Sequence, residues 1–241
     1  MKAFAKEYGV DCQHNLFNGG DGSFENPYKI RTVTQFNNMN YYYIDEIYFD
    51  LIDNINLSNT NITIGTKEKQ FAGIFNGNNF TISGVSLNGT AESIGLFAYV
   101  NGGTISNVKL NASVSISRIS ETYAGLLVGY GKNVRIENVA ISGSITQSGN
   151  STASSAIYIG GAVGYAFGES TSITKVKNTA NIVFNSKGTN IIAYAGGIVG
   201  YYTASEGDNS GIIKCGNEGQ ISGTICGGLV GYGNCPIVDS Y

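Results

Sequence analysis

The stretch Cys226-Gly-Gly-Leu-Val-Gly-Tyr232 decides the fold, because variants of it recur along the 241-residue chain. Close variants begin at Ile159 and Ala195, and looser variants begin at Ser93 and Ala124. Aligned on their final tyrosines, successive copies lie 31, 35, 36 and 31 residues apart. A period that is bounded but uneven indicates a repeat architecture in which each repeat stacks on its neighbours.

Each repeat contains three short segments with strand character and no helix between them. The first segment is the glycine-rich heptad itself. The second is an aliphatic run such as 104–110 or 135–141, and the third is a run such as 113–116 or 143–146. This pattern predicts an all-β fold, a right-handed parallel β-helix (solenoid) with three short strands per rung.

Positions within the heptad predict how the rungs pack. One heptad column is entirely apolar, as expected for like side chains stacked inside a solenoid: Phe97, Val128, Val163, Val199 and Val230. The glycine before each tyrosine is predicted to mark a corner where a side chain would clash, with Ala98 as the exception. Recurrence also excludes a phosphate-binding loop, because such a loop is a single site that opens a helix.

The N-terminal part of the chain differs from the repeats. We assign residues 1–70 to a cap and the first rungs, and residues 71–241 to the repeat β-helix, within a single structural domain. Residues 32–39 predict a short capping helix with Thr32 or Thr34 as N-cap and with Val33, Phe36 and Met39 on one face. Such a helix would cover the open first rung. Because the chain stops in the middle of a repeat, we expect it to belong to a longer protein that carries any export signal or anchor.

Composition argues against several classes of protein. Only 13% of residues are charged, the net charge is −3 and no block of Lys or Arg occurs, so nucleic-acid binding is not expected. No apolar run approaches the ~18 residues of a transmembrane helix, so no membrane insertion is expected within this segment. His14 is the lone histidine and no Cys-x-x-Cys pair occurs, so we predict no metal site and no cofactor.

The four cysteines are Cys12, Cys215, Cys226 and Cys235. Three of them cluster in the last repeats, which is compatible with one or two disulfides. A role as small buried apolar side chains is equally compatible with their positions. The sequence leaves the pairing open.

The repeats resemble a known family. Gly197-Ile-Val-Gly-Tyr201 and Gly228-Leu-Val-Gly-Tyr232 are similar to the GLUG motif of large bacterial surface proteins, which include adhesin-like proteins and segments attached to IgA-specific metallopeptidases. Residues 26–30 and 71–82 are similar to the segments that precede the first copy in such proteins. The resemblance implies a parallel β-helix on an extracellular or cell-surface protein and carries no catalytic residues. A peptidase would need a His-Glu-x-x-His zinc motif, which one histidine cannot supply.

Acidic side chains are the candidates for catalysis, since many β-helix proteins cleave acidic polysaccharides. Asp45, Glu46, Asp50 and Asp53 crowd one segment. Glycosidase or lyase chemistry needs carboxylates that converge on one site. Asp50 and Asp53 differ in strand parity and are expected to point apart, so we interpret the segment as a solvated strand and assign no catalytic residue.

Tyrosines are the candidates for binding. One column contains Tyr99, Tyr130, Tyr165, Tyr201 and Tyr232, and a second column, seven residues earlier, contains Tyr123, Tyr158 and Tyr194 between Glu92 and Ile225. We interpret the first column as packing at a rung corner. The second is equally open to packing and to binding a sugar or a protein partner, because tyrosine offers a large rigid contact with a polar tip.

One further column begins with asparagine. Asn107 and Asn138 align, but the next rungs place Lys175, Lys214 and Asp239 there. An asparagine ladder is therefore expected to cover two rungs at most.

Together these features predict a non-catalytic repeat module of a secreted or cell-surface protein, acting in adhesion or in binding of a host protein or glycan. The expected contact residues are Tyr123, Tyr158 and Tyr194, with variable loops at 147–155, 185–190 and 203–210. A polysaccharide lyase or hydrolase on the same scaffold and a purely structural stalk are the alternatives.

Overall fold

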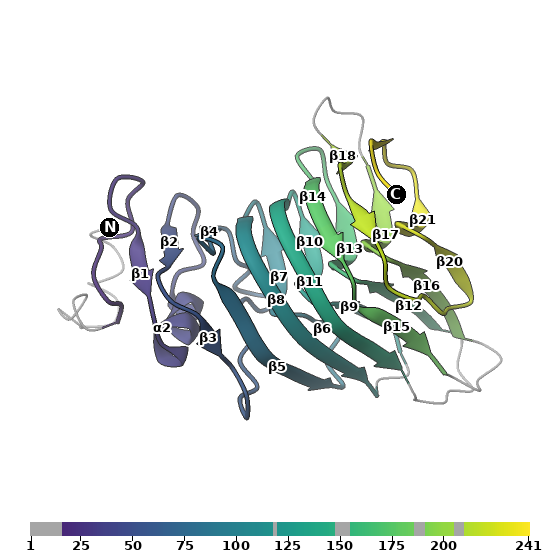
Figure 1. Cartoon of the computed structure of the whole chain (residues 1–241), viewed down its shortest axis with the longest axis horizontal. Coiled ribbons are helices and arrows are strands. Elements are labelled where there is room, and N and C mark those ends of the chain that lie inside the picture. Colours follow the sequence, from purple (N-terminus) through teal and green to yellow (C-terminus); the bar gives the residue numbers. More distant parts are fainter. Residues whose placement is uncertain (1–15, 118–119, 148–154, 186–190, 205–209) are drawn as a thin grey trace.

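The computed structural model describes residues 16–117, 120–147, 155–185, 191–204 and 210–241. Its strands stack as successive turns along one long axis, with the N-terminal turns at one end and the C-terminal turns at the other (Figure 1). All strand pairs within these ranges are parallel. The predicted parallel β-helix is confirmed.

Three sheets, here called sheets A, B and C, form the walls of the solenoid. The main path of sheet A is β1 (Tyr28–Ile30), β2 (Tyr48–Leu51), β4 (Ile74–Asn76), β8 (Thr104–Ile116), β11 (Arg135–Gln147), β14 (Ser172–Asn178), β18 (Gly211–Ile213) and β22 (Ile237–Val238). Three further strands pair with this path: β5 (Thr81–Gly89), β15 (Asn181–Phe184) and β19 (Gly216–Asn217). A fourth, β3 (Ile55–Asn56), pairs with β5. Sheet B contains β7 (Phe97–Asn101), β10 (Val128–Lys132), β13 (Val163–Phe167), β17 (Val199–Thr203) and β21 (Val230–Gly233). Sheet C contains β6 (Ser93–Ile94), β9 (Thr122–Gly125), β12 (Ser155–Gly160), β16 (Ile191–Gly196) and β20 (Ile225–Gly227).

The heptad is a corner between two strands, and the prediction that it forms one strand is wrong. In the second copy, β9 of sheet C leads through the fully buried Leu126 and Leu127 into β10 of sheet B. The predicted second and third strands are instead continuous in β8 and β11, which each span 13 residues of sheet A. The rungs of β8 and β11 therefore contribute three strands, one to each sheet, and in the next rung the sheet A strand is divided into β14 and β15.

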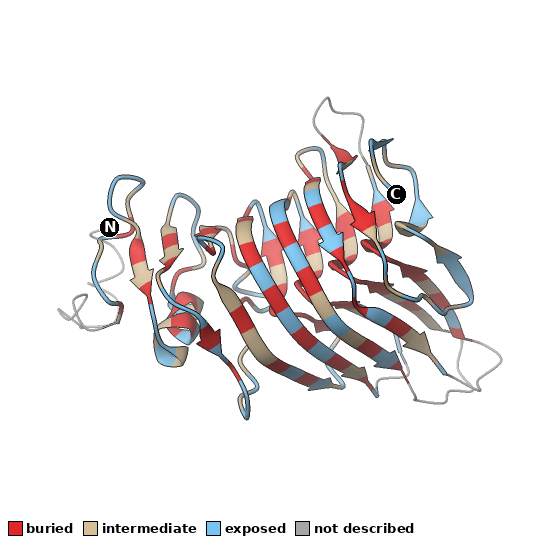
Figure 2. Ribbon diagram, viewed as in Figure 1, coloured by how far each residue is buried: buried red, intermediate tan, exposed pale blue. Residues whose placement is uncertain are grey.

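A residue in the left-handed backbone conformation recurs in five successive rungs of sheet A, within β8, β11 and β14 and directly after β18 and β22. These residues are Asn107, Asn138, Lys175, Lys214 and Asp239, with φ between 50° and 54°. In β8 the two buried neighbours, Ile105 and Val108, lie three residues apart instead of two. The left-handed residue thus resets the alternation of inward and outward side chains, which Figure 2 shows as bands along β8 and β11.

Aliphatic columns inside the stack supply the core. Ile105, Ile136, Ile173 and Ile212 occupy one column of sheet A and are at most 1% exposed. Burial of each such side chain stabilises the fold by about 1.5–3 kcal/mol relative to exposure. Since every rung buries its inward row against the next, the rungs support one another.

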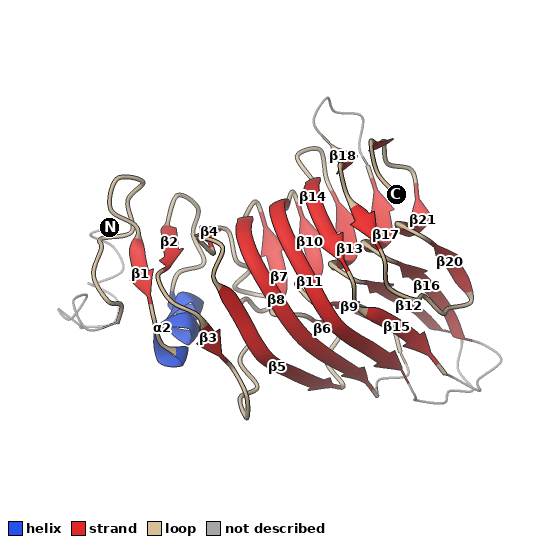
Figure 3. Cartoon of the chain, viewed as in Figure 1, coloured by secondary structure: helices blue, strands red, loops and turns tan. Residues whose placement is uncertain are grey.

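The predicted helix is present as α2 (Val33–Asn38), followed by the 3₁₀ turn η2 (Met39–Tyr41), at the N-terminal end of the stack (Figure 3). Thr32 is the N-cap, because its hydroxyl accepts from the Gln35 backbone N–H while the Gln35 side chain accepts from the Thr32 N–H. Phe36 is fully buried and its ring contacts Phe75 and Phe97. In η2, the side chain of Asn40 bonds the backbone at Thr63 and Gly65. The helix and the 3₁₀ turn therefore pack against the N-terminal part of the solenoid.

Candidate functional site

The two tyrosine columns lie in register on the outside of sheets B and C. On sheet B, Tyr99, Tyr130, Tyr165, Tyr201 and Tyr232 are aligned partners in neighbouring strands. On sheet C, Tyr123, Tyr158 and Tyr194 are aligned in the same way. Except for Tyr232, which is 54% exposed, these side chains are half-buried. We call these eight residues the tyrosine array.

Stacking is close and nearly parallel in the middle of the sheet B column and along the sheet C column, whereas the end pairs Tyr99–Tyr130 and Tyr201–Tyr232 of sheet B are tilted. On sheet B, the rings of Tyr165 and Tyr201 have centroids 5.1 Å apart at an interplanar angle of 2°, and Tyr130 and Tyr165 lie 5.6 Å apart at 10°. On sheet C, Tyr158 stacks on both Tyr123 and Tyr194 at 5.5 Å. These are distances of direct aromatic contact, each favourable by about 0.5–1.5 kcal/mol beyond area burial.

The columns also contact each other edge to face, so they form one array. Tyr165 of sheet B meets both Tyr123 (5.4 Å, 66°) and Tyr158 (5.3 Å, 79°) of sheet C. Tyr201 likewise meets Tyr158 (5.2 Å, 80°) and Tyr194 (5.7 Å, 86°). The sequence analysis described two separate columns, whereas in the structure the rings of the two columns are in contact.

Glycine before the sheet B tyrosine brings the columns together. A Cβ on Gly164 would clash with the backbone N of Ala124, and a Cβ on Gly200 would clash with the backbone N of Ile159. The sheet B strand therefore lies directly against the sheet C strand of the preceding rung. The predicted clash of a side chain at these glycines is thus confirmed, but they lie inside the sheet B strands β13 and β17 and not at the corner.

The ends of the sheet C column are set by other residues. Ile225 pairs with Tyr194 as predicted. At the other end Ser93, and not Glu92, pairs with Tyr123, so that part of the predicted alignment is wrong. Ser93 lies six residues before Tyr99, whereas its partner Tyr123 lies seven before Tyr130, so the first heptad copy is one residue shorter between the two columns.

Stacking limits what a ligand could contact. Because successive rings already touch, no further ring fits between them, and the ring faces inside the array are occupied by other tyrosines. A partner would meet a row of ring edges and hydroxyl groups. Tyr232, at the C-terminal end and more than half exposed, differs from this description.

The carboxylates of Glu92 and Glu121 act on the tyrosines at one end of the array. Burial, together with a hydrogen bond to Glu121, raises the pKa of Tyr123 well above its ordinary value. Burial and the negative charge of Glu121 raise the pKa of Tyr158 to about 12. Lys67 binds Glu92 at 2.8 Å, and the charges of both are felt at Tyr130. The hydroxyls of Tyr123 and Tyr158 therefore stay protonated and able to donate at neutral pH.

The asparagine column forms a longer hydrogen-bonded ladder than predicted. Asn138 Nδ2 donates to Asn107 Oδ1 (2.8 Å), Asn107 Nδ2 donates to Asn76 Oδ1 (2.9 Å), and Asn76 Nδ2 contacts Asp50 Oδ1 (3.3 Å). Asp50 is also bound by Lys29 Nζ at 2.7 Å. The ladder thus joins β1, β2, β4, β8 and β11, and the expectation of two rungs was too short.

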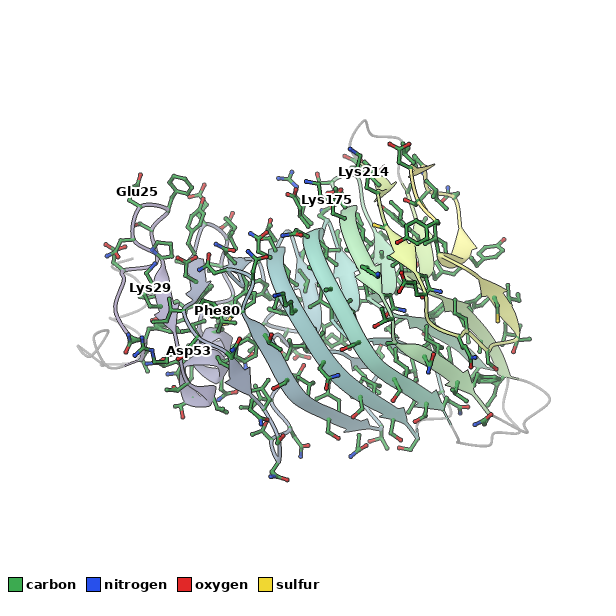
Figure 4. The ribbon with its side chains drawn as sticks, in the orientation of Figure 1. Glu25, Lys29, Asp53, Phe80, Lys175 and Lys214 are labelled. Atoms are coloured by element: carbon green, nitrogen blue, oxygen red, sulfur yellow. The ribbon has the colours of Figure 1, made fainter. Side chains whose placement is uncertain are left out.

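Beyond the ladder the same column is charged. Figure 4 shows Lys175 and Lys214 projecting from neighbouring strands of sheet A. Lys175 Nζ lies 3.2 Å from Glu137 Oε1, and both side chains are more than half exposed. An exposed pair of this kind adds at most about 1 kcal/mol of stability.

The acidic segment 45–53 contains Asp50 and Asp53, which were predicted to point apart. Asp50 is engaged by Lys29 and Asn76, whereas the Asp53 carboxylate accepts from the Asn54 backbone N–H. Their side chains therefore serve different local bonds and do not converge. In the described ranges, no group of three or more His, Cys, Asp or Glu side chains is placed to hold a metal ion.

Three of the four cysteines are described, and none of these three forms a disulfide. Cys215 is buried and its thiol lies 3.3 Å from the Ile173 carbonyl, as expected for a core residue. Burial raises the pKa of Cys235 to about 11. Cys12, His14 and most of the predicted variable loops lie outside the described residues.

Comparison with known proteins supports the fold. A protein of Evansella cellulosilytica named "Putative Gly-rich membrane protein" is 30% identical over 136 residues, which cover 53% of this chain and 16% of that protein. The chain thus spans about a sixth of the length of this curated relative. The crystal structure of "a putative immunoglobulin A1 protease" from Bacteroides ovatus is similar over 94% of this chain and 78% of that chain, with a TM-score of 0.55 and 18% identity.

No family model matches the chain, so the GLUG resemblance stands on its motif residues. Among the described residues, no helix is both long and apolar enough to cross a bilayer. The Bacteroides structure shares the fold of this chain, and at 18% sequence identity the similarity shows the fold alone.

Proposed function

We propose that this chain is a non-catalytic binding module of a secreted or cell-surface protein and that it recognises a protein partner through the tyrosine array. The observation that carries the proposal is the order of the array itself. Eight tyrosines are held at fixed spacing on the outside of the solenoid, where the core does not require them.

Rigidity favours recognition by such a surface. Each ring inside the array is held by neighbours above, below and on the other sheet, so little side-chain freedom is lost on binding. Tyrosine is enriched at protein interfaces and in antibody paratopes for the same reason.

Ring-edge display favours a protein over a stacked sugar. A sugar that binds aromatic residues by stacking needs an open ring face, and the faces inside the array are covered by other rings. Hydroxyl tips and ring edges instead suit the mixed polar and apolar surface of a protein. The name of the Evansella relative, a membrane protein, and that of the Bacteroides neighbour, a protease, support a surface setting.

The test is a binding screen of the chain against extracellular host proteins and a glycan array. We expect a protein ligand whose affinity falls at least tenfold when Tyr123, Tyr158 and Tyr194 are all replaced by Phe. This triple variant keeps the rings and removes only the hydroxyls, so its unfolding midpoint is expected to stay near that of the parent.

Tyr41→Phe is the matched control, because Tyr41 is 54% exposed and lies outside the array. A ligand bound equally well by the parent and the triple variant would refute a role for these hydroxyls. Binding to glycans alone would assign the module to carbohydrate recognition instead.

A further inference from the structure

An open hollow of about 200 Å³ lies on the outer face of sheet A, over β5, β8, β11 and β14. These four strands are neighbours in the sheet and run side by side (Figure 1). The tyrosine array lies on sheets B and C, so the hollow belongs to a different wall of the solenoid.

The hollow arises from one column of outward side chains in sheet A. Lys109, Ala140 and Lys177 are aligned partners in β8, β11 and β14. The methyl group of Ala140 lies between two long side chains, which leaves space above it. Leu110 and Ile141 also line the hollow, and because their side chains are buried in the core, their backbone forms its floor.

Two ammonium groups make the hollow positive. Lys109 and Lys177 are exposed and lie two strand spacings apart, about 10 Å between their backbones. Each ammonium is carried on a flexible four-carbon stem, so both can converge on one group above Ala140. Within the described ranges, no acidic residue lines the hollow. A chain of net charge −3 thus carries a locally cationic site here.

Both lysines have N–H donors for a ligand. Among the residues that the structure describes, none forms an ion pair with Lys109. Lys177 Nζ binds Glu218 Oε1 at 2.7 Å, which shows that a glutamate carboxylate fits beside this ammonium. Glu218 follows β19, which pairs with β14 on the side away from β11, so it reaches Lys177 from outside the hollow. An ammonium has three N–H donors, so others remain for a ligand.

The other polar side chains of the hollow offer mainly acceptors. Asn111 Nδ2 donates to Ser142 Oγ at 3.0 Å, and Ser142 Oγ donates to the Leu110 carbonyl at 3.3 Å. Thr179 Oγ1 donates to the Ile141 carbonyl at 3.1 Å. These donors are used within the sheet, and oxygen lone pairs of the same side chains are left for N–H groups of a ligand.

An acidic peptide matches these groups better than an acidic sugar does. A glutamate residue brings a carboxylate for the two ammonium groups, methylenes for the Ala140 methyl and the lysine stems, and backbone N–H donors for the acceptors. A sugar ring would find no aromatic face to stack on, because within the described ranges no aromatic side chain lines the hollow.

We propose that this hollow binds a glutamate side chain of an acidic polypeptide segment and holds its carboxylate between Lys109 and Lys177. The segment lies extended over sheet A, and its backbone N–H groups donate to the side chains of Asn111, Ser142 and Thr179. The site is independent of the tyrosine array.

The test is binding of a labelled peptide of alternating glutamate and serine to the full chain, measured by fluorescence anisotropy at low salt. The alternation places every glutamate on one face of an extended peptide. The matched peptide of glutamine and serine should bind about tenfold more weakly or worse, because it lacks the carboxylates. Glu218→Gln should strengthen binding of the acidic peptide, because it removes a carboxylate that competes for Lys177.

Single substitutions locate the site. Lys109→Gln and Lys177→Gln should each weaken binding of the acidic peptide about fivefold. Lys214→Asn is the matched control, because it removes the same charge from sheet A at a left-handed position that asparagine occupies in other rungs. It should leave the affinity nearly unchanged. The triple Phe variant of the array should bind the peptide as the parent does, so the two proposals fail separately.

Three results would overturn the proposal. Equal loss of affinity in Lys214→Asn would mean that the peptide responds to overall charge. Equal binding of the glutamine peptide, or no binding of either peptide, would exclude a carboxylate site. Tighter binding of an oligogalacturonate, lost in the Lys109 and Lys177 variants, would assign the hollow to an acidic sugar.

Discussion

Tyr165 and Tyr201, one rung apart on sheet B, are stacked with their ring centroids 5.1 Å apart and their planes 2° from parallel. Both rings also meet Tyr158 of sheet C edge to face. An outward-facing side chain of a solenoid commonly has only solvent and its column neighbours as partners. Here the outer surface has packing of its own, and this packing can be measured as stability.

Tyr165→Ala should destabilise the fold by about 2–4 kcal/mol, because it removes a large half-buried ring and several aromatic contacts. Tyr165→Phe should cost less than about 1 kcal/mol, since the ring remains. Urea denaturation followed by circular dichroism measures both changes. Equal losses for Ala and for the exposed control Tyr41→Ala would show that the array adds no stability.

Alkaline pH should weaken the fold through Tyr158. Its pKa is raised from 10.0 to about 12 in the folded chain, so the unfolded chain loses this proton first. Stability from the neutral hydroxyl is therefore full below pH 10 and is lost as the pH rises from 10 towards 12. Unfolding midpoints measured across this window should fall, and they should fall less steeply in Tyr158→Phe. An unchanged slope in that variant would exclude Tyr158 as the source.

Gly164→Ala should destabilise the chain by about 3 kcal/mol, because the added Cβ would clash with backbone atoms of Ala124, which cannot move aside without shifting β9. Gly228→Ala is the matched control, since its Cβ meets nothing within 4 Å. Thermal unfolding of the two variants makes the comparison. If Gly164→Ala were tolerated as well as Gly228→Ala, the contact between β13 and β9 would be looser than the geometry indicates.

Lys214→Gly should stabilise the chain by about 0.5–1 kcal/mol, a result opposite to that usual for glycine in a strand. Lys214 has a φ of 53°, a conformation that costs a residue with a Cβ about 1–2 kcal/mol, part of which the greater freedom of unfolded glycine offsets.

Lys109→Gly is the counterpart, because Lys109 is an exposed residue within β8 that has no positive φ. It should destabilise the chain by about 0.5–1 kcal/mol. Urea denaturation gives both values. A loss of stability in both variants would mean that the left-handed geometry carries no strain at Lys214.

Much of the fold followed from the heptad. Its tyrosines predicted the sheet B register, and its apolar positions predicted the core, because parallel rungs place like residues over like. The bend within the heptad could not be predicted from the sequence. Leu126 and Leu127 are consecutive and both buried, so the corner shows no alternation of polar and apolar residues.

The site was predicted only in parts. Both tyrosine columns could be predicted from the sequence. Contact between the columns depends on how closely Gly164 allows β13 to approach β9, and the number of residues between the tyrosines does not give that distance. The ladder beyond Asn107 was missed because Asp50 and Asn76 lie before the first heptad copy. The cluster Asn76-Gly-Asn-Asn79 was the available signal, since asparagine favours left-handed turns.

The left-handed column of sheet A has a consequence for how this surface can change. Asparagine, lysine and aspartate hold nearly the same φ at Asn138, Lys175 and Asp239, so backbone shape there does not depend on which of them is present. The outward side chains at this position, one in each rung, can therefore be substituted without a change in the solenoid backbone. The polarity and charge of these side chains can therefore vary during evolution. The buried aliphatic columns lack this freedom, because their side chains form the core.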